Sequence, residues 1–167
     1  MALLPLTISL VPMEQSDFDK FERRAIPGFA HAKVAAGEWS SEEAVEKAGA
    51  KLRQLLPQGL LAARNHLLVV KSTDDGRRVG ELWVAERLVG KRKIAIILDL
   101  YIEEAERRRG FGKQSLFAVE SLARQLGWVE VRLQVFGDNV AAQKLYEESG
   151  YSIKSFVMAK VLRTDVE

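Results

Sequence analysis

The chain has 167 residues, 47% of them hydrophobic, and its 25 basic and 23 acidic side chains leave a formal net charge of +2. This length and apolar content predict one globular domain over residues 1–167. Nucleic-acid binders carry a concentrated basic field, so the near balance of charge argues against a nucleic-acid partner. The chain has no cysteine, which excludes disulfides, thiolate catalysis and cysteine-ligated zinc, and no metal site is expected.

The apolar start of the chain, residues 1–11, has neither the charged region nor the small-residue cleavage site of a secretory signal. It is also too short to span a bilayer. We therefore expect a cytoplasmic protein with no membrane partner, in which this segment leads into a first strand over residues 6–11.

Two helices are predicted next. A first helix is expected from Ser16 or Asp17 through about Ala36, and Pro27-Gly28 should break or kink it. Residues 37–40 have the composition of a turn. The second helix is expected to start at a Ser40 or Ser41 cap and to end before Pro57.

Three strands are expected to follow, separated by segments with turn chemistry at residues 73–76 and 88–90. Short turns of this kind join antiparallel neighbours. We therefore predict an antiparallel meander over residues 66–71, 79–86 and 93–102.

The second half of the chain alternates helices and strands. The apolar residues Leu116, Val119 and Leu122 recur at helical spacing, which predicts a helix over residues 112–125 that Gly127 ends. A strand over 129–136, a helix over 139–149 and one or two strands within 151–162 complete a βαβαβ pattern. The whole is an α/β fold with a mixed central sheet.

A glycine-punctuated basic turn joins the last meander strand to the helix over residues 112–125. Gly110 and Gly112 let the backbone approach an anion, and the first N–H groups of the helix point toward it. Arg107, Arg108, Arg109 and Lys113 add positive charge. The turn lacks the Walker pattern, because Lys113 precedes Gln114, and it lacks the dinucleotide fingerprint, whose third glycine would fall at Ser115.

A second motif follows about thirty residues later. Asn139 is a good cap for a helix, Tyr146 lies seven residues on along the same helix face, and Gly150 marks the helix end. Together with Arg107-x-x-Gly110-x-Gly112, this order and spacing resembles the GNAT superfamily of acyl-CoA-dependent N-acetyltransferases. The resemblance covers residues 65–162, and the first 60 residues match in that the family usually begins with a strand and two helices.

Within the superfamily, the segments Lys33-Val-Ala-Ala-Gly-Glu-Trp39, Leu55-Leu-Pro-Gln-Gly59 and Gly80-Glu-Leu-Trp83 look like a bacterial branch of largely uncharacterised acetyltransferases. The resemblance implies a GNAT-like mixed central sheet with helices on both faces. It also implies that acetyl-CoA, the acetyl donor, lies in a cleft between two splayed central strands.

By that resemblance, the strand before the turn pairs its backbone with pantetheine, the backbone of the turn cradles the pyrophosphate, and Asn139 contacts the cofactor arm. Phe111 either shields the cofactor or staples the helix. The residues expected to bind the cofactor are Leu100, Tyr101, Ile102, Arg107, Arg108, Arg109, Gly110, Phe111, Gly112, Lys113, Asn139 and Tyr146.

Transfer to an amine requires a base for the amine and a proton for the departing thiolate. The resemblance puts the Tyr146 phenol near the thioester sulfur, and its ordinary pKa near 10 keeps it protonated. The alternative is that Tyr146 is an ordinary half-buried aromatic residue. Some family members carry a glutamate five residues before the asparagine, where this chain has Gln134, which is not a useful base.

Asp99 is the best substitute base, because it interrupts an apolar strand and partial burial would raise its pKa. The structural alternative is a paired aspartate that orients other groups. Glu81, on the neighbouring strand, is the second candidate base, and Glu38 the third.

His31, Glu38 and Trp39 are candidate lining for the acceptor pocket, with packing and capping as the alternative. The sequence therefore predicts an N-acetyltransferase that moves an acetyl group from acetyl-CoA to a primary amine, by direct attack in a ternary complex. The acceptor, a small molecule or a peptide, is not specified. One alternative is a catalytically degenerate module that binds acyl-CoA as a sensor, another is a phosphate-ligand domain unrelated to CoA, and a homodimer is a further expectation from the superfamily.

Overall fold

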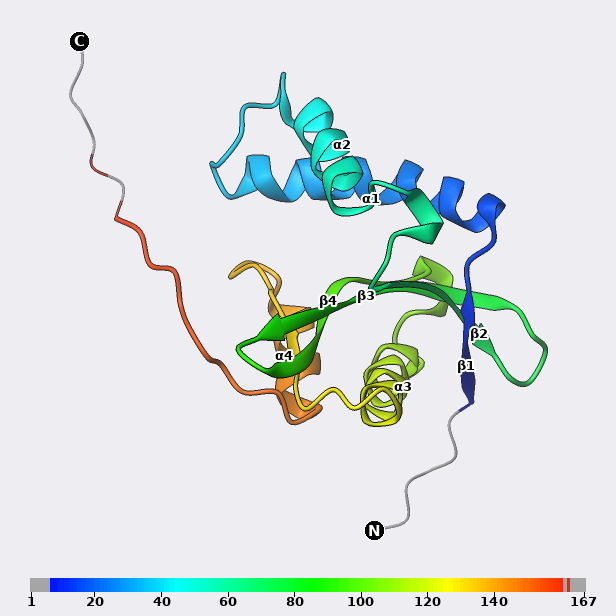
Figure 1. Ribbon diagram of the computed structural model, residues 1–167. Helices are drawn as coiled ribbons and strands as arrows, with labels where there is room; N and C mark the ends of the chain where they lie inside the picture. Colours follow the sequence, from blue (N-terminus) through cyan, green and yellow to red (C-terminus); the bar gives the residue numbers. More distant parts are fainter. Residues whose placement is uncertain (1–6, 161, 163–167) are drawn as a thin grey trace.

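The computed structural model describes residues 7–160 and 162, which form a five-stranded mixed sheet flanked by helices (Figure 1). The strands lie in chain order, and the first four are antiparallel, whereas β5 runs parallel to β4. The predicted α/β class and the antiparallel meander are therefore confirmed. The strands are β1 (Ile8–Pro12), β2 (Asn65–Ser72), β3 (Arg78–Val89), β4 (Arg92–Ile102) and β5 (Val131–Leu133).

Helices cover both faces of the sheet, as predicted. α1 (Gln15–Ala35) and α2 (Ala44–Leu55) lie on one face, and α3 (Phe111–Gln125) and α4 (Val140–Glu148) lie on the other (Figure 1). Short 3-10 turns, η1 (Gly59–Leu61) and η2 (Glu104–Glu106), precede β2 and α3. Each face has its own apolar core: the first is built around Phe21 and Trp83, and the second around Leu82 and Leu116.

The first helix differs from the prediction at Pro27. The expected break is wrong, because α1 is a single helix of 21 residues that contains this proline. A proline inside a helix costs one backbone hydrogen bond, and here packing holds both halves: Phe21 is fully buried against the sheet and Ala30 packs against α2. α1 begins at a capping box formed by Glu14 and Asp17, and not at a Ser16 cap.

The second half follows the predicted alternation through α4 but lacks its last strands. The strand expected over 129–136 is reduced to Val131–Leu133, and no strand is formed in the described residues of 151–162. β5 pairs only with Ala95–Ile97 on β4. The backbone of 152–160 makes no hydrogen bond to any described residue, so nothing there stabilises a strand. The observed pattern is therefore βαβα.

A β-bulge interrupts the pairing of β3 with β4. Trp83 pairs with Asp99 and Val84 pairs with Ile97, so Leu98 is one extra residue on β4. β5 also stops beside Ile97. Beyond that point, the edge of β4 that faces β5 has no neighbouring strand among the described residues, which is the splay that the resemblance implies.

Candidate active site

The bulge decides which way the end of β4 presents its side chains. Before the bulge, Ile97 contributes to the core on the α3 face. After it, Leu100 and Ile102 do, although strict alternation from Ile97 would have pointed them to the other face. Asp99 and Tyr101 are consequently turned toward α1.

Arg24 of α1 meets both carboxylates that the sequence singled out. Its Nε donates to Glu81 and its Nη2 to Asp99, while Nη1 lies 3.5 Å from the second oxygen of Asp99. The guanidinium also stacks over the ring of Tyr101, 4.4 Å from the ring centroid to Cζ. One arginine therefore joins the helix to two strands of the sheet.

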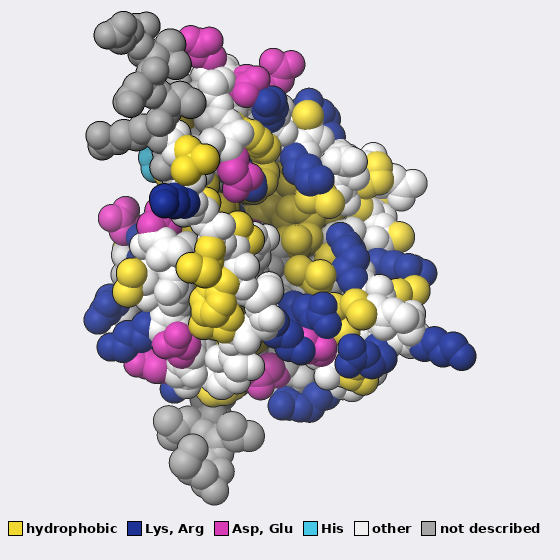
Figure 2. Space-filling model, turned by 90° about the vertical axis from the view of Figure 1, so that its left-hand side faces the viewer, with side chains coloured by type: hydrophobic (Ala, Val, Ile, Leu, Met, Phe, Trp, Pro, Cys, Tyr) yellow, Lys and Arg dark blue, Asp and Glu magenta, His cyan; other side chains and the backbone are white. Residues whose placement is uncertain are grey.

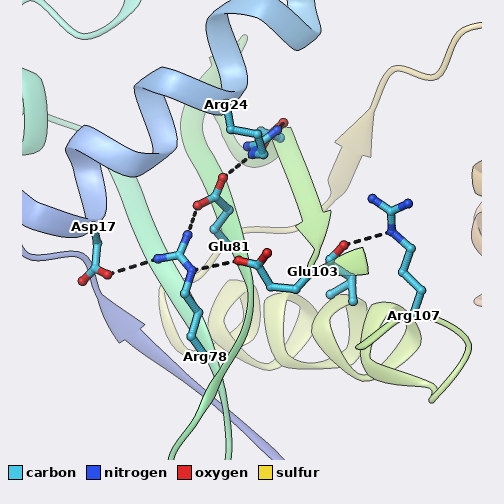
Figure 3. Close-up of polar contacts among 8 residues, drawn as sticks. Asp17, Arg24, Arg78, Glu81, Glu103 and Arg107 are labelled. Atoms are coloured by element: carbon cyan, nitrogen blue, oxygen red, sulfur yellow. Dashed lines mark hydrogen bonds and ion pairs between the residues drawn. The ribbon is translucent and has the colours of Figure 1, made fainter. Parts of the chain in front are cut away.

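Arg78, at the start of β3, extends this network on the other side of Glu81 (Figure 3). It donates to Glu81 and lies 3.1 Å from both Asp17 and Glu103. The same elements enclose a hollow of about 340 Å³ lined by Lys20, Arg24, Arg78, Glu81, Tyr101 and Glu103. We call the ion-paired set Asp17, Arg24, Arg78, Glu81, Asp99 and Glu103 the carboxylate network.

The two candidate bases differ in access. The Glu81 side chain is 2% exposed, and each of its oxygens accepts from a different arginine. The Asp99 side chain is 25% exposed. Burial raises the pKa of the Asp99 carboxyl, and the Arg24 guanidinium opposes that rise. Asp99 is thus the more exposed of the two carboxylates, although Glu81 and not Asp99 lines the 340 Å³ hollow.

Tyr146 lies on α4, half-buried against the α3-side core. Its ring is tilted against that of Tyr151, with the centroids 6.0 Å apart. Burial raises the pKa of the Tyr146 phenol, and the negative charge of Asp99 raises it further. The phenol therefore stays protonated at neutral pH and lies within electrostatic reach of Asp99.

The backbone conformation of the basic turn is its distinguishing feature. Gly110 caps α3 in the left-handed conformation at φ +83°, and Arg108 is also left-handed at φ +63°. The backbone N–H groups from Arg108 to Lys113 donate to no described residue. At Gly112, an added Cβ would lie 3.1 Å from Leu145 of α4, so the turn packs closely against that helix.

The side chains of the turn are mostly engaged elsewhere. Arg107 Nε donates to the Ile102 carbonyl at 3.1 Å (Figure 3), and Arg109 pairs with Glu106 at 2.6 Å. Phe111 is 6% exposed within the core, which favours the staple interpretation over a shield for a cofactor. Lys113 has no ion-pair partner among the described residues.

Asn139 and His31 line a second hollow, of about 530 Å³, between the end of α1 and the loop before α4. The Asn139 side chain also caps α4 by accepting from the Ala142 N–H at 3.2 Å. Glu38 pairs with Lys33 at 2.5 Å, and Trp39 packs edge-on against Phe29. Of the three residues predicted to line the pocket for the acetyl acceptor, His31 alone lines this hollow.

The face that carries α4 and β5 is hollowed (Figure 2). Hydrophobic side chains form the floor of the hollow, and Lys and Arg side chains gather along one side. An apolar floor with a basic margin suits a long ligand that carries phosphate groups at one end.

Sequence reasoning missed Arg24 and Arg78. The available signal was indirect: a carboxylate withdrawn from water on an apolar strand requires a cation, and Glu81 is buried while Asp99 is partly buried on such strands. Which arginine supplies the cation depends on how α1 crosses the sheet, and no local pattern encodes that crossing.

Residues 7–160 and 162 contain neither a metal site nor a membrane-spanning helix. No cluster of three or more His, Asp or Glu side chains there is arranged to hold a metal ion. No helix in the same ranges has both the length and the apolar content that crossing a membrane requires.

The model of the acetyltransferase (GNAT) family matches residues 33–151. This range contains the bulge, the basic turn and α4. The chain belongs to the GNAT acetyltransferase family. The family assigns it to the N-acetyltransferases and leaves the reaction itself open.

Relatives in Bacillus subtilis agree with this assignment. The chain is 34% identical to the uncharacterised N-acetyltransferase YycN over 94% of this chain and all of YycN, and 29% identical to the uncharacterised N-acetyltransferase YdgE over 94% of this chain and 99% of YdgE. The crystal structure of YycN matches with a TM-score of 0.89 over 95% of this chain and all of that one. An acetyltransferase structure from Pyrococcus furiosus, at 24% identity, shares the fold with a TM-score of 0.68, over 93% of this chain and 99% of that one.

Proposed function

We propose that this protein transfers an acetyl group from acetyl-CoA to a primary amine, by direct attack in a ternary complex. The observation that carries the proposal is the run of backbone N–H groups from Arg108 to Lys113, which find no acceptor among residues 7–160 and 162 and lie next to an edge of β4 that no described strand covers. Such a run at a helix N-terminus favours a phosphate.

The residues present suit acetyl-CoA. Around Gly110, no atom lies within 4 Å of an added Cβ, so the backbone is open to a pyrophosphate. The backbone of Leu100, Tyr101 and Ile102 has no strand beside it on the β5 side in the part of the chain that the structure describes, and it offers hydrogen bonds to the pantetheine amides. Because Arg107 and Arg109 are engaged with Ile102 and Glu106, the backbone, Arg108 and Lys113 supply most of the phosphate binding.

Asp99 is the proposed base. Its side chain is 25% exposed, and its raised pKa makes it a better proton acceptor than an ordinary aspartate. Arg24 holds it in place, and Glu81, held in turn by Arg78, fixes Arg24. Glu81 is therefore proposed as a positioning residue.

Tyr146 is the proposed acid. Its raised pKa keeps a proton available for the sulfur of CoA, which leaves as a thiolate unless it is protonated. The donor for the carbonyl oxygen is a backbone N–H of β4 near Leu100. No nucleophile on the enzyme is needed, because the amine attacks the thioester itself.

The charge of the carboxylate network favours a cationic acceptor. It contains four carboxylates and two guanidinium groups, and Lys20 adds one positive charge at the rim of the hollow. The remaining excess of negative charge attracts an ammonium group. The amine then loses a proton to Asp99 before it attacks.

Thermal unfolding with ligands tests the donor. Acetyl-CoA should raise the melting temperature, since a ligand that binds only the native state stabilises it by mass action. S-acetylpantetheine, which lacks the pyrophosphate, should give little or no shift. Absence of a shift at millimolar acetyl-CoA would contradict the proposal.

Thiol release tests the transfer. Purified protein with acetyl-CoA should release CoA in the presence of one class among polyamines, amino acids, aminoglycosides and peptides. Binding of acetyl-CoA without turnover on any of them would favour a sensor module over an enzyme.

A further inference from the structure

The two hollows of this molecule border the same helix, α1. The smaller, of about 340 Å³, is lined on the helix side by Lys20 and Arg24. The larger, of about 530 Å³, includes His31 and Ala35 in its lining. Spacings of four, seven and four residues put these positions on one face of the helix. The helical rise places His31 about 10 Å beyond Arg24 along the axis, and Ala35 about 16 Å beyond it.

Gly28 forms the surface of α1 between the two hollows. It lies four residues after Arg24 and three before His31, near the same helix face, and it is exposed. A Cβ added at Gly28 would have no atom within 4 Å. Because glycine has no side chain, nothing projects from the helix at this point. We therefore describe the two hollows and the Gly28 surface together as the α1 groove.

The far end of the α1 groove has the chemistry of an ammonium site. The loop between β5 and α4 lies beside the end of α1 (Figure 1) and contributes Phe136 and Asp138 to the lining of the larger hollow. Asp138 pairs with no cation in the described part of the chain. An aromatic ring next to a carboxylate without a counter-ion attracts a primary ammonium group.

Lys33 shows that a primary ammonium is accommodated in this region. Its Nζ lies 2.5 Å from Glu38 and 5.8 Å from the centroid of the Phe136 ring. Lys33 is not part of the lining of the larger hollow, so that hollow is open to a second ammonium. Because Glu38 neutralises Lys33, the negative charge of Asp138 remains available to a ligand.

We propose that the acceptor is a linear diamine or polyamine that lies along the α1 groove, with one amine at Asp99 and a second ammonium at Phe136 and Asp138. This inference rests on the proposed function and specifies its acceptor. Arg24 connects the near end of the groove to the reaction, because it lines the smaller hollow and donates to Asp99.

The transfer itself is the one already proposed, applied to one end of the acceptor. The N–C bond forms at the amine near Asp99 as the C–S bond of acetyl-CoA breaks. Asp99 takes the proton that the amine loses, and Tyr146 protonates the sulfur of CoA. The products are a monoacetylated diamine and CoA.

The length and the second charge of the acceptor should both matter. A short diamine cannot reach both ends of the groove, because they are at least about 10 Å apart along α1. A monoamine of sufficient length reaches the far end but offers no ammonium to Phe136 and Asp138. We expect either defect to lower kcat/KM by about tenfold or more.

Thiol release with three amines tests this acceptor class. α,ω-Diaminoheptane should have a kcat/KM at least about tenfold higher than heptylamine, which is as long but lacks the second ammonium. It should exceed α,ω-diaminopropane, which is too short, by a similar factor. Mass spectrometry should find one acetyl group on the product. Equal kcat/KM values for diaminoheptane and heptylamine, or no turnover of diaminoheptane, would overturn the inference.

Thermal unfolding distinguishes this failure from failure of the proposed function. Acetyl-CoA should raise the melting temperature whichever amine is accepted. If acetyl-CoA gives the shift and the enzyme does not distinguish the three amines, the acceptor inference is wrong and donor binding stands. If acetyl-CoA gives no shift, the proposed function is wrong and the acceptor inference fails with it.

Variants at the far end of the groove test the ammonium site. Asp138→Asn should reduce the ratio of kcat/KM for diaminoheptane to that for heptylamine to about one. Asp74→Asn, at another exposed aspartate, should keep the wild-type ratio. A wild-type ratio in Asp138→Asn would overturn the assignment of the second ammonium to this end.

A larger side chain at Gly28 tests the continuity of the groove. Gly28→Leu should lower kcat/KM for diaminoheptane by about tenfold or more, because its side chain stands between the two ends. Ser121→Leu, at an exposed position of α3 on the other face of the sheet, is the control and should not lower it. Both positions are exposed, so both variants should keep the wild-type circular dichroism spectrum. Undiminished kcat/KM in folded Gly28→Leu would show that the acceptor does not lie along α1.

Discussion

Two charged regions of this molecule are built by opposite means. The turn before α3 presents backbone N–H groups from Arg108 to Lys113, and its arginine side chains are largely bound elsewhere. The carboxylate network under α1 is made entirely of side chains from distant segments, with Arg24 and Asp99 75 residues apart. The first depends on chain conformation and the second on tertiary packing.

This difference determines which substitutions should disrupt each region. Substitutions that alter backbone conformation should damage the turn, whereas charge-removing substitutions that keep the shape of a side chain should damage the network. In our proposal, the turn binds the donor and the network activates the acceptor. Variants of the two regions should therefore separate donor affinity from catalysis.

The largest effect is expected for Asp99→Asn. Loss of the base should lower kcat/KM by about 100- to 10,000-fold, while acetyl-CoA binding, measured by calorimetry, should be unchanged. In the wild type, protonation of Asp99 slows the reaction as pH falls, and its raised pKa moves this fall above the pH typical of an aspartate. Asp99→Asn should lose that limb of the pH profile.

The exposed carboxylate of Asp75, paired with Arg77 outside the site, provides the control. Asp75→Asn should keep the low-pH limb. If Asp99→Asn kept it as well, Asp99 would not be the base, and the network would be structural.

Tyr146→Phe should come next, with kcat lowered by about 100-fold and KM nearly unchanged, because the phenol acts only as the thiolate leaves. The neighbouring tyrosine is a matched control. The Tyr151 hydroxyl is buried without a hydrogen-bond partner among the described residues. Tyr151→Phe should keep kcat and raise the free energy of unfolding by about 1 kcal/mol in urea denaturation. Equal kcat values for the two variants would show that Tyr146 is not the general acid.

A third variant, Glu81→Gln, tests whether the network also supports the fold. It weakens contacts to two arginines at a position that is almost fully buried, so the free energy of unfolding should fall by about 2 kcal/mol. Urea denaturation measures the change. An unchanged unfolding midpoint would mean that the arginines find other partners, and that Glu81 does not position Arg24.

The smallest effect is expected at the turn. Gly110 and Gly76 both have positive φ and no atom within 4 Å of an added Cβ. Gly110→Ala and Gly76→Ala should each cost about 1 kcal/mol of stability. Gly110→Ala alone should weaken acetyl-CoA binding, by about tenfold in a calorimetric titration. Equal affinities in both variants would place the pyrophosphate elsewhere.

The turn before α3 was easier to predict from the sequence than the carboxylate network, because the turn depends on local conformation and the network on tertiary packing. The turn was predictable because the spacing of Gly110 and Gly112 encodes backbone conformation locally. The meander followed from the turn chemistry between its strands, and α3 followed from the helical spacing of its apolar residues. The start of α2 was predicted wrongly, because the helix begins at Ala44 and not at a Ser40 or Ser41 cap. Arg24 was not predictable as the partner of Asp99, because that contact depends on how α1 crosses the sheet. The strands expected after residue 150 failed for a related reason: a strand needs a neighbour, and strand propensity alone does not supply one.

The bulge at Leu98 makes one position of β4 tolerant to change beside the site. Leu98 is 38% exposed and pairs with no residue of β3, so most side chains should be accepted there. Ile97 pairs with Val84, and Asp99 pairs with Trp83, the neighbouring residue of β3. Deleting Leu98 would therefore leave a regular ladder in which Asp99 still points toward α1. The residue that the bulge adds to the strand can be replaced or lost without moving the carboxylate to the other face.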